Sequence, residues 1–241
     1  MTHWTAQIKH HRKKIHSQCG EEGFIEFILE NIGLNIPDMN IVEFGAGDGV
    51  SLSNSKYFID NGAWAMRFDG DPEGSKDVHQ LWLNNEEVKE IAEHCNDHRK
   101  CDVLMIDVDG NDYWFIKTFI ENSVNKPSLV VCEINPIFKR DEVAVMPYNE
   151  AHTFKDNDYY GMSLAAIDLL MDKKGYCLVY VNDSLNAYFV LKSLLKRGFE
   201  RPEIEYRRKQ DHPPYREGLW LIDDLPFASK EDEWPIRRYH L

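Results

Sequence analysis

The sequence predicts an α/β protein: a doubly wound, mostly parallel sheet of about seven strands that ends in an antiparallel strand pair. Continuous apolar runs at residues 40–44, 102–107 and 128–133 are typical of parallel strands covered on both faces. Helical patterns separate these runs, so right-handed crossovers are expected to join the strands. Two later runs, 177–181 and 187–191, follow each other across a short polar turn, which indicates an antiparallel pair.

The chain has 241 residues, enough to bury a full core, and we expect a single domain (1–241). It divides into an N-terminal arm and helix (1–35), a core (36–195) and a C-terminal appendage (196–241). Trp220, Leu221, Ile222 and Trp234 are the expected anchors of the appendage. Hydrophobic residues make up 43% of the chain and aromatic residues 12%, which fits an ordinary globular protein.

A formal net charge of −13 argues against nucleic acid or an anionic membrane as the main partner, because both would repel the chain. The basic run His10–Lys14 is interpreted as a solvated arm. The cysteine count of five is odd and no pair has C-x-x-C spacing, which indicates free thiols in a reducing compartment. Without an apolar stretch of membrane length or a signal peptide, the expected location is cytoplasmic. The expected partner is a small-molecule or glycan acceptor, and a homodimer stays open.

The pattern along the chain predicts the remaining elements. Apolar positions from Phe24 to Ile32 trace one helical face, and Gly33 suits the end of that helix. The other expected elements are helices at 51–59, 74–85, 112–120 and 163–174, a strand at 64–68, a short strand at 88–92 within the charged segment 86–100, and a long loop at 136–161. A loop of that length in a compact domain is usually functional.

A glycine-rich turn follows the first buried strand. It contains Gly45, Gly47 and Gly49, with Glu43 two residues before its first glycine. Glycine lets backbone approach a ligand closely. A dinucleotide fingerprint needs its third glycine one residue later, where this chain has Val50. The arrangement instead favours S-adenosylmethionine. Asp69, directly after the next strand, is expected to accept the ribose hydroxyls, with Asp71 as an alternative.

Acidic residues follow two other buried strands, Asp107 and Asp109 after one and Glu133 at the end of the next. Ligands of open α/β sheets bind at this edge. We expect these acids to act as a general base or to hold a divalent cation such as Mg²⁺. An EF-hand is excluded because Asp112 stands where glycine is required, and Asp112 is expected to cap a helix. His152, in the long loop, is an alternative base.

Several motifs resemble one family. They are Ser17-Gln18-x-Gly20-Glu21-x-Gly23, Val42-Glu43-Phe44-Gly45-Ala46-x-Asp48-Gly49, Leu52-Ser53-Asn54-Ser55, Asp69-Gly70-Asp71-Pro72, Ile106-Asp107-Val108-Asp109-Gly110, Cys132-Glu133-Ile134-Asn135-Pro136 and Leu185-Asn186-Ala187-Tyr188. Over about residues 16–195 the chain resembles the FkbM-type S-adenosylmethionine-dependent methyltransferases, which are class I and Rossmann-like. The residues that would line the cofactor are Gln18, Glu43, Gly45, Ala46, Gly47, Asp48, Gly49, Asn54, Asp69, Gly70 and Asp107.

The resemblance implies that Asp107 lies beside the methylsulfonium and that Gln18 closes over the site. It also implies O-methylation of a hydroxyl on a sugar, glycan or glycosylated small molecule. The segment 86–100 shows no sign of the expected third strand and its adenine contact. Two alternatives stay open: a nicotinamide-dependent oxidoreductase, and a non-catalytic binding protein with a methyltransferase fold.

Overall fold

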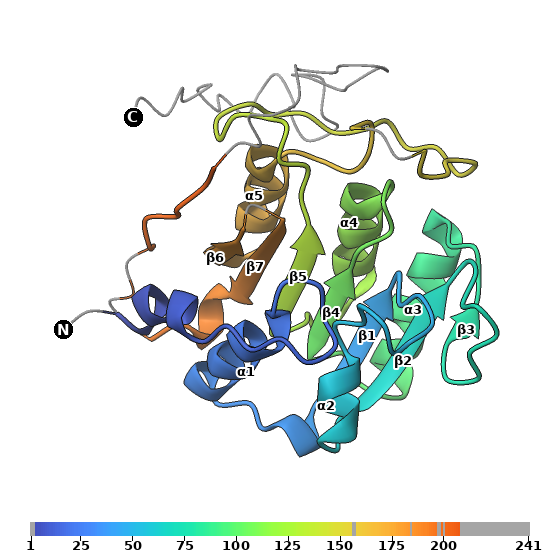
Figure 1. Cartoon of the computed structure of the whole chain (residues 1–241), viewed down its shortest axis with the longest axis horizontal. Coiled ribbons are helices and arrows are strands. Elements are labelled where there is room, and N and C mark those ends of the chain that lie inside the picture. Colours follow the sequence, from blue (N-terminus) through green and yellow to red (C-terminus); the bar gives the residue numbers. More distant parts are fainter. Residues whose placement is uncertain (1–2, 156–157, 184, 197–198, 200, 208–241) are drawn as a thin grey trace.

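A computed structural model describes residues 3–155, 158–183, 185–196, 199 and 201–207. Its seven-stranded sheet has the order β3-β2-β1-β4-β5-β7-β6 (Figure 1). The strands are β1 (Asn40–Phe44), β2 (Trp64–Asp69), β3 (His79–Gln80), β4 (Val103–Ile106), β5 (Leu129–Glu133), β6 (Tyr176–Asn182) and β7 (Asn186–Leu191). Pairing is parallel from β3 to β5, whereas β7 is antiparallel to both β5 and β6. The predicted α/β sheet and its terminal antiparallel pair are therefore confirmed, and the strand order is that of a class I methyltransferase fold.

Helices cover both faces of the sheet. They are α1 (Glu21–Ile32), α2 (Lys56–Asp60), α3 (Asn85–Asp97), α4 (Asp112–Asn122) and α5 (Leu164–Lys173), with 3₁₀ turns at Trp4–His10, Ile36–Asp38 and Lys192–Leu194. Successive strand residues point to opposite faces. In β4, Val103 and Met105 face the core that α1 and α2 complete, while Leu104 and Ile106 face the core formed with α3, α4 and α5. Burial on both faces is why these strands read as continuous apolar runs.

The segment 74–100 differs from the prediction. The expected helix at 74–85 is absent: residues 74–84 contain only the two-residue strand β3, whose residues are both exposed, and α3 begins at Asn85. The expected short strand at 88–92 lies inside α3. A capping box starts this helix: the Asn84 side chain accepts from the backbone N–H groups of Glu86 and Glu87, and the Glu87 carboxylate accepts from the Asn84 N–H at 3.0 Å. Both predictions for this segment were wrong.

The helix predicted at 51–59 is also shorter than expected, because α2 begins only at Lys56. Residues 53–55 before it form a turn that binds the Glu43 carboxylate. That turn sits between the glycine turn and α2.

The C-terminal part is described only as far as residue 207. Ile204 is buried against the core on the α5 side, and the Tyr206 hydroxyl donates to the carbonyl oxygen of Phe138 at 2.8 Å. Trp220, Leu221, Ile222 and Trp234 lie outside the described residues. The five cysteines are free thiols, as predicted. None of the helices in the described part of the chain has the length and apolar content needed to span a membrane.

Candidate active site

The glycine turn after β1 packs directly on the end of β4. Gly45 has φ +81°, and a Cβ on it would overlap the carbonyl oxygen of Asp107. Only glycine permits this approach. Gly47 differs, because a Cβ on it would meet no atom within 4 Å. The turn is therefore fixed against the sheet at Gly45 and opens to free space at Gly47.

Asp69, at the end of β2, is joined to this turn. One oxygen of its carboxylate, Oδ2, accepts the N–H of Gly47 at 2.8 Å, and Oδ1 accepts the N–H of Asp71 at 2.9 Å. Each oxygen of a carboxylate can accept about two hydrogen bonds, so each has capacity for another donor. Asp69 can thus hold the turn and also receive two hydroxyl groups.

Trp82 lies beside the glycine turn and Asp69, a placement that was not predicted from the sequence. Its ring lies over Gly70, where a Cβ would meet the ring at 2.5 Å, and its Nε1–H donates to the carbonyl oxygen of Glu150 at 3.0 Å. The residue is 54% exposed. A fixed, open aromatic face beside Asp69 suits stacking of a planar heterocycle. The signal available in the sequence was an isolated tryptophan shortly after the acid-tipped second strand.

Glu43 is buried, and its carboxylate accepts hydrogen bonds from other residues of the protein. It accepts the N–H of Asn54 at 2.8 Å and the hydroxyl groups of Ser53, at 3.2 Å, and Ser55. Burial raises the pKa of Glu43, and the hydrogen bond from Ser55 opposes that rise. Its visible role is to shape the turn that carries Asn54, and direct contact with a cofactor stays a prediction.

Other residues expected near the cofactor also shape the turn. The Asp48 carboxylate accepts the N–H groups of Val50, at 2.7 Å, and Ser51, at 2.6 Å, which lowers its pKa. The Arg67 guanidinium donates to the carbonyl oxygen of Gly49, and a Cβ on Gly49 would lie 2.7 Å from that side chain. Ala46 is buried.

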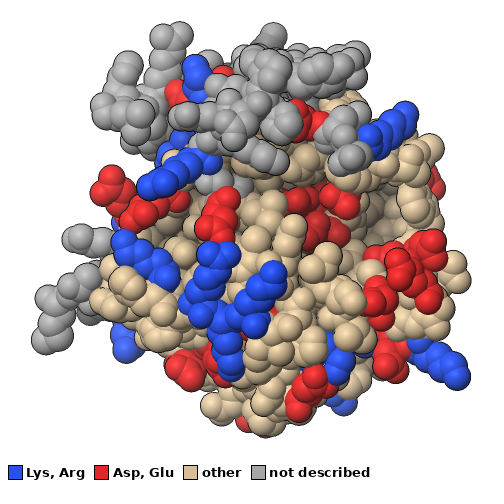
Figure 2. Space-filling model, in the orientation of Figure 1, with Lys and Arg blue, Asp and Glu red and all other residues tan. Residues whose placement is uncertain are grey.

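The acids expected at the ends of β4 and β5 lie together. One carboxylate oxygen from each of Asp107, Asp109 and Glu133 falls within 4.8 Å of the other two. Burial, followed by the nearby Asp112 charge, raises the pKa of Asp107 to about 8 and that of Asp109 to about 6. Burial and the Asp107 charge raise the pKa of Glu133 well above its usual range. Figure 2 shows acidic side chains in the upper middle of the drawn face and a larger group of them at its right.

The loop that carries Asp109 is held from α4. The Asp112 carboxylate accepts the N–H groups of Val108 and Gly110, each at 2.9 Å. Asp109 has φ +51°, a left-handed conformation uncommon for a non-glycine residue, which this pair of bonds supports. Asp112 therefore stabilises the preceding loop, and the predicted capping role was wrong, because the N-cap residue of α4 is Asn111.

His152 lies beside Asp109. Its Nε2 is 3.1 Å from the carbonyl oxygen of Asp109, and its ring packs on Gly110. A carbonyl oxygen only accepts, so Nε2 carries the hydrogen of this bond. Any base function of His152 then belongs to Nδ1.

The long loop is well anchored along its described part. The Asn111 side chain exchanges two hydrogen bonds with the backbone of Asn149, at 2.9 and 3.1 Å, and Trp114 Nε1–H donates to the carbonyl oxygen of Met146 at 2.8 Å. Asn135 Nδ2 donates to the carbonyl oxygen of Tyr160 at 3.0 Å. Burial, with the acids of the cluster, raises the pKa of the Tyr160 hydroxyl. The loop thus brings aromatic side chains close to the acids.

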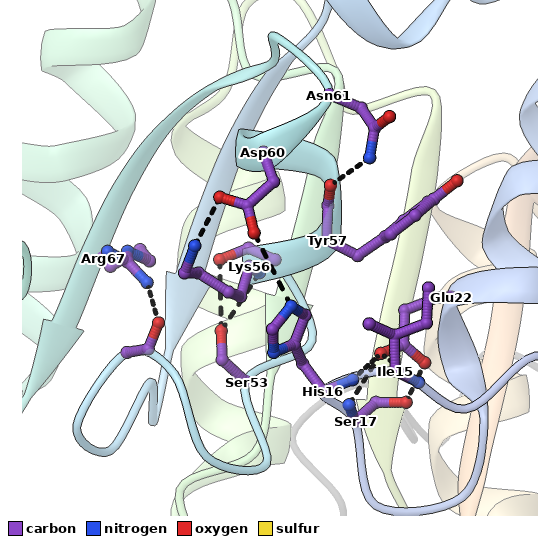
Figure 3. A network of polar contacts seen from close by, with 12 residues as sticks. Ile15, His16, Ser17, Glu22, Ser53, Lys56, Tyr57, Asp60, Asn61 and Arg67 are labelled. Atoms are coloured by element: carbon purple, nitrogen blue, oxygen red, sulfur yellow. Dashed lines mark hydrogen bonds and ion pairs between the residues drawn. The ribbon is translucent and has the colours of Figure 1, made fainter.

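The N-terminal Ser-Gln-x-Gly-Glu segment is built around two buried glutamates. The Glu22 carboxylate accepts the N–H groups of His16, at 2.6 Å, and Ser17, at 2.7 Å (Figure 3). Glu21 accepts from Asn186 at 2.9 Å, and Asn186 pairs with Glu133 across β5 and β7. These bonds hold Gln18 exposed near the edge where β5 ends, and its closure over a cofactor stays a prediction.

Comparison with known proteins adds little to this geometry. No protein family model matches the chain, and no curated protein matches it in sequence. Among solved structures, a candidate hemolysin from Lactococcus lactis is 11% identical, with a TM-score of 0.41 over 69% of this chain and 84% of that one. A chain of the fibrillarin/Nop5p complex is also 11% identical, with a TM-score of 0.36 over 64% of this chain and 71% of that one. The fold assignment rests on strand order and not on these similarities.

Proposed function

We propose that this protein is an S-adenosylmethionine-dependent O-methyltransferase of FkbM type. Its acceptor is a hydroxyl on a sugar, a glycan or a glycosylated small molecule. The class I methyltransferase strand order, the open glycine turn bonded to Asp69 and the acids after β4 and β5 support this proposal. Fold alone does not define function, so the weight falls on the site.

The observation that carries the proposal is the electrostatic character of the glycine turn. In a dinucleotide-binding fold, a pyrophosphate meets the free N–H groups of the helix that follows the turn. Here α2 starts only at Lys56, and the buried Glu43 carboxyl group takes the hydroxyls of Ser53 and Ser55 and the N–H of Asn54 just before it. An acidic group of the protein itself therefore occupies the start of this helix.

The opposite edge of the turn favours a cation. Asp69 is bonded to Gly47, while Asp107 directly follows the strand that Gly45 packs against. A phosphate there would face the Asp69 carboxylate and would oppose ionisation of Asp107, whereas the positively charged sulfonium of S-adenosylmethionine would favour the ionised form of Asp107. This contrast is why we prefer a methyl donor to a nicotinamide coenzyme.

Methyl transfer is a displacement in which the acceptor oxygen attacks the methyl carbon while the carbon–sulfur bond breaks and sulfur keeps the electron pair. The enzyme mainly positions the two reactants. The acceptor proton goes to a carboxylate of the cluster, with Asp107 as first candidate and Asp109 and Glu133 in support. His152 Nδ1 is the alternative acceptor of that proton.

On the cofactor side, Asp69 would receive the ribose hydroxyls through the remaining capacity of its two oxygens. Trp82 would stack on the adenine, the contact that segment 86–100 was expected to supply. Ala46, Asp48, Gly49 and Asn54 would line the turn around the amino-acid tail. The expected partner remains a small molecule or glycan, in the cytoplasm, with no role for nucleic acid or membrane.

The proposal is tested by calorimetry of the full chain with S-adenosylhomocysteine and with NAD. We expect only S-adenosylhomocysteine to bind, and Asp69→Asn to weaken it about 10- to 100-fold, since a hydrogen bond to a charged group contributes about 1.5–3 kcal/mol. Asp77→Asn, at an exposed position in the same segment, is the matched control and should bind as the wild type does. Binding of NAD alone would replace the proposal with an oxidoreductase.

A second measurement separates an enzyme from a non-catalytic binding protein. Labelled methyl groups should appear on a member of a glycan and glycoside panel, and Asp107→Asn should slow that transfer while S-adenosylhomocysteine binding persists. Cofactor binding without transfer to any acceptor would favour the non-catalytic alternative.

A further inference from the structure

One carboxylate oxygen in the site, Oε2 of Glu133, is buried without a hydrogen-bond partner in the described part of the chain, which is rare in protein interiors. Almost all buried polar atoms are paired, and an exception calls for a specific explanation such as an ion. The charged groups that act most strongly on Glu133, namely Asp107, Asp112 and Asp109, are all acids. Either a proton shared with Asp107 or a bound cation would compensate this carboxyl group, and cation binding distinguishes the two.

The surrounding oxygens have the spacing of a cation site. One oxygen from each of Asp107, Asp109 and Glu133 lies within 4.8 Å of the others. Ligand oxygens lie about 2.0–2.1 Å from Mg²⁺ and about 2.3–2.6 Å from Ca²⁺, so two on opposite sides of one ion are roughly 4–5 Å apart. Carboxylate oxygens are also the ligands that such hard cations prefer. The three groups can therefore reach one ion with little movement.

The supports of these side chains are rigid. Ile106 pairs with Cys132, so Asp107 and Glu133 are the next residues on neighbouring parallel strands and lie side by side. Asp109 is fixed by the two bonds from the loop to Asp112. Glu133 is further held by pairing with Asn186 of β7. A cation site needs such support, because loosely held ligands bind poorly.

We propose that Asp107, Asp109 and Glu133 bind one divalent cation of the Mg²⁺ or Mn²⁺ type. The binding itself is independent of the proposed function. Its role rests on that function: the ion would take the acceptor hydroxyl as a further ligand, lower the pKa of that hydroxyl and orient its oxygen toward the methyl group. Because the three carboxylates would then hold the ion, the acceptor proton would go to His152 Nδ1, the alternative base. The acceptor class is then narrowed to molecules with an oxygen able to bind a hard cation, such as a sugar with adjacent hydroxyls.

The test uses the full chain after treatment with EDTA and removal of the chelator. Mn²⁺ is added, and the loss of the free Mn²⁺ electron paramagnetic resonance signal measures binding, with no need for cofactor or acceptor. We expect about one site per chain with a dissociation constant on the order of 10⁻⁴ M or tighter. Mg²⁺ should compete, and Mn²⁺ should raise the midpoint of thermal unfolding.

Two variants locate the site. Glu133→Gln and Asp109→Asn should each weaken Mn²⁺ binding at least tenfold. Both keep the shape of the side chain and remove a charge from a crowded acidic cluster, so the variants should fold, which circular dichroism verifies. Asp141→Asn, at an exposed position, is the control and should leave binding unchanged. Unchanged Mn²⁺ binding in both site variants would overturn the proposal. So would the absence of binding to the wild type at about 1 mM Mn²⁺, a concentration roughly ten times the expected dissociation constant.

The result is distinguishable from failure of the proposed function. S-adenosylhomocysteine binding without Mn²⁺ binding would leave a methyltransferase whose buried carboxyls share a proton instead of a cation. Mn²⁺ binding that depends on Glu133, without cofactor binding, would keep the cation site and remove its proposed role.

Discussion

A methyl group added at Gly47 tests whether the glycine turn contacts the cofactor. Gly47 has φ +52°, and a Cβ there would meet no protein atom within 4 Å. Gly47→Ala therefore adds only the backbone penalty of a left-handed alanine, about 1–2 kcal/mol. For a domain of this size, the midpoint of thermal unfolding should fall by roughly 2–8 °C. A ligand resting on the turn would instead collide with the new methyl, and its affinity should fall at least tenfold.

Gly33→Ala is the matched control. Gly33 ends α1 with φ +81° and likewise has no atom within 4 Å of a built Cβ. Its stability loss should be similar, while its affinity for S-adenosylhomocysteine should match the wild type. Scanning calorimetry gives the first quantity and titration calorimetry the second. Wild-type affinity in Gly47→Ala would refute the placement of the cofactor against this turn.

Three further predictions follow from the structure. Trp82→Ala should weaken S-adenosylhomocysteine by roughly 1–3 kcal/mol, a typical value for a stacked base, in titration calorimetry; wild-type affinity would remove Trp82 from the site. Asn84→Ala should lower the free energy of unfolding by about 1 kcal/mol through loss of the α3 cap, measured in urea. Hydrogen bonds from Ser17 and His16 outweigh burial and lower the pKa of Glu22. Its contribution to stability is therefore present above its usual pKa, near 4.5, and is lost as pH falls below it. In Glu22→Gln the free energy of unfolding should therefore fall less steeply as pH decreases below that value. An unchanged pH dependence would contradict this role of Glu22.

The fold was predictable because most of its strands are buried on both faces. Burial of β1, β4 and β5 requires apolar residues at successive positions, which is visible in sequence. The two exposed residues of β3 leave no such trace. In α3, charged residues hide the four buried positions, although the Asn84 and Glu87 capping box was present as a signal.

The site was predictable only where topology alone determines position. Acids at the ends of neighbouring parallel strands must meet, so Asp107 and Glu133 could be placed together from sequence. The direction in which each side chain points could not be predicted from the sequence. Glu43 faces the turn at residues 53–55, and Trp82 lies over Gly70 from the segment that follows β3. Those placements depend on loop geometry, which one sequence does not determine.

We propose that the glycine turn holds a methyl donor whose sulfur faces the acids at the carboxyl ends of β4 and β5. A crystal structure of the chain with S-adenosylhomocysteine and Mn²⁺ tests it most directly. We predict the ribose on Asp69, the turn at Gly47 against the ligand, and a manganese anomalous peak between Asp107, Asp109 and Glu133. A cofactor bound away from Gly47 and Asp69 would contradict the claim.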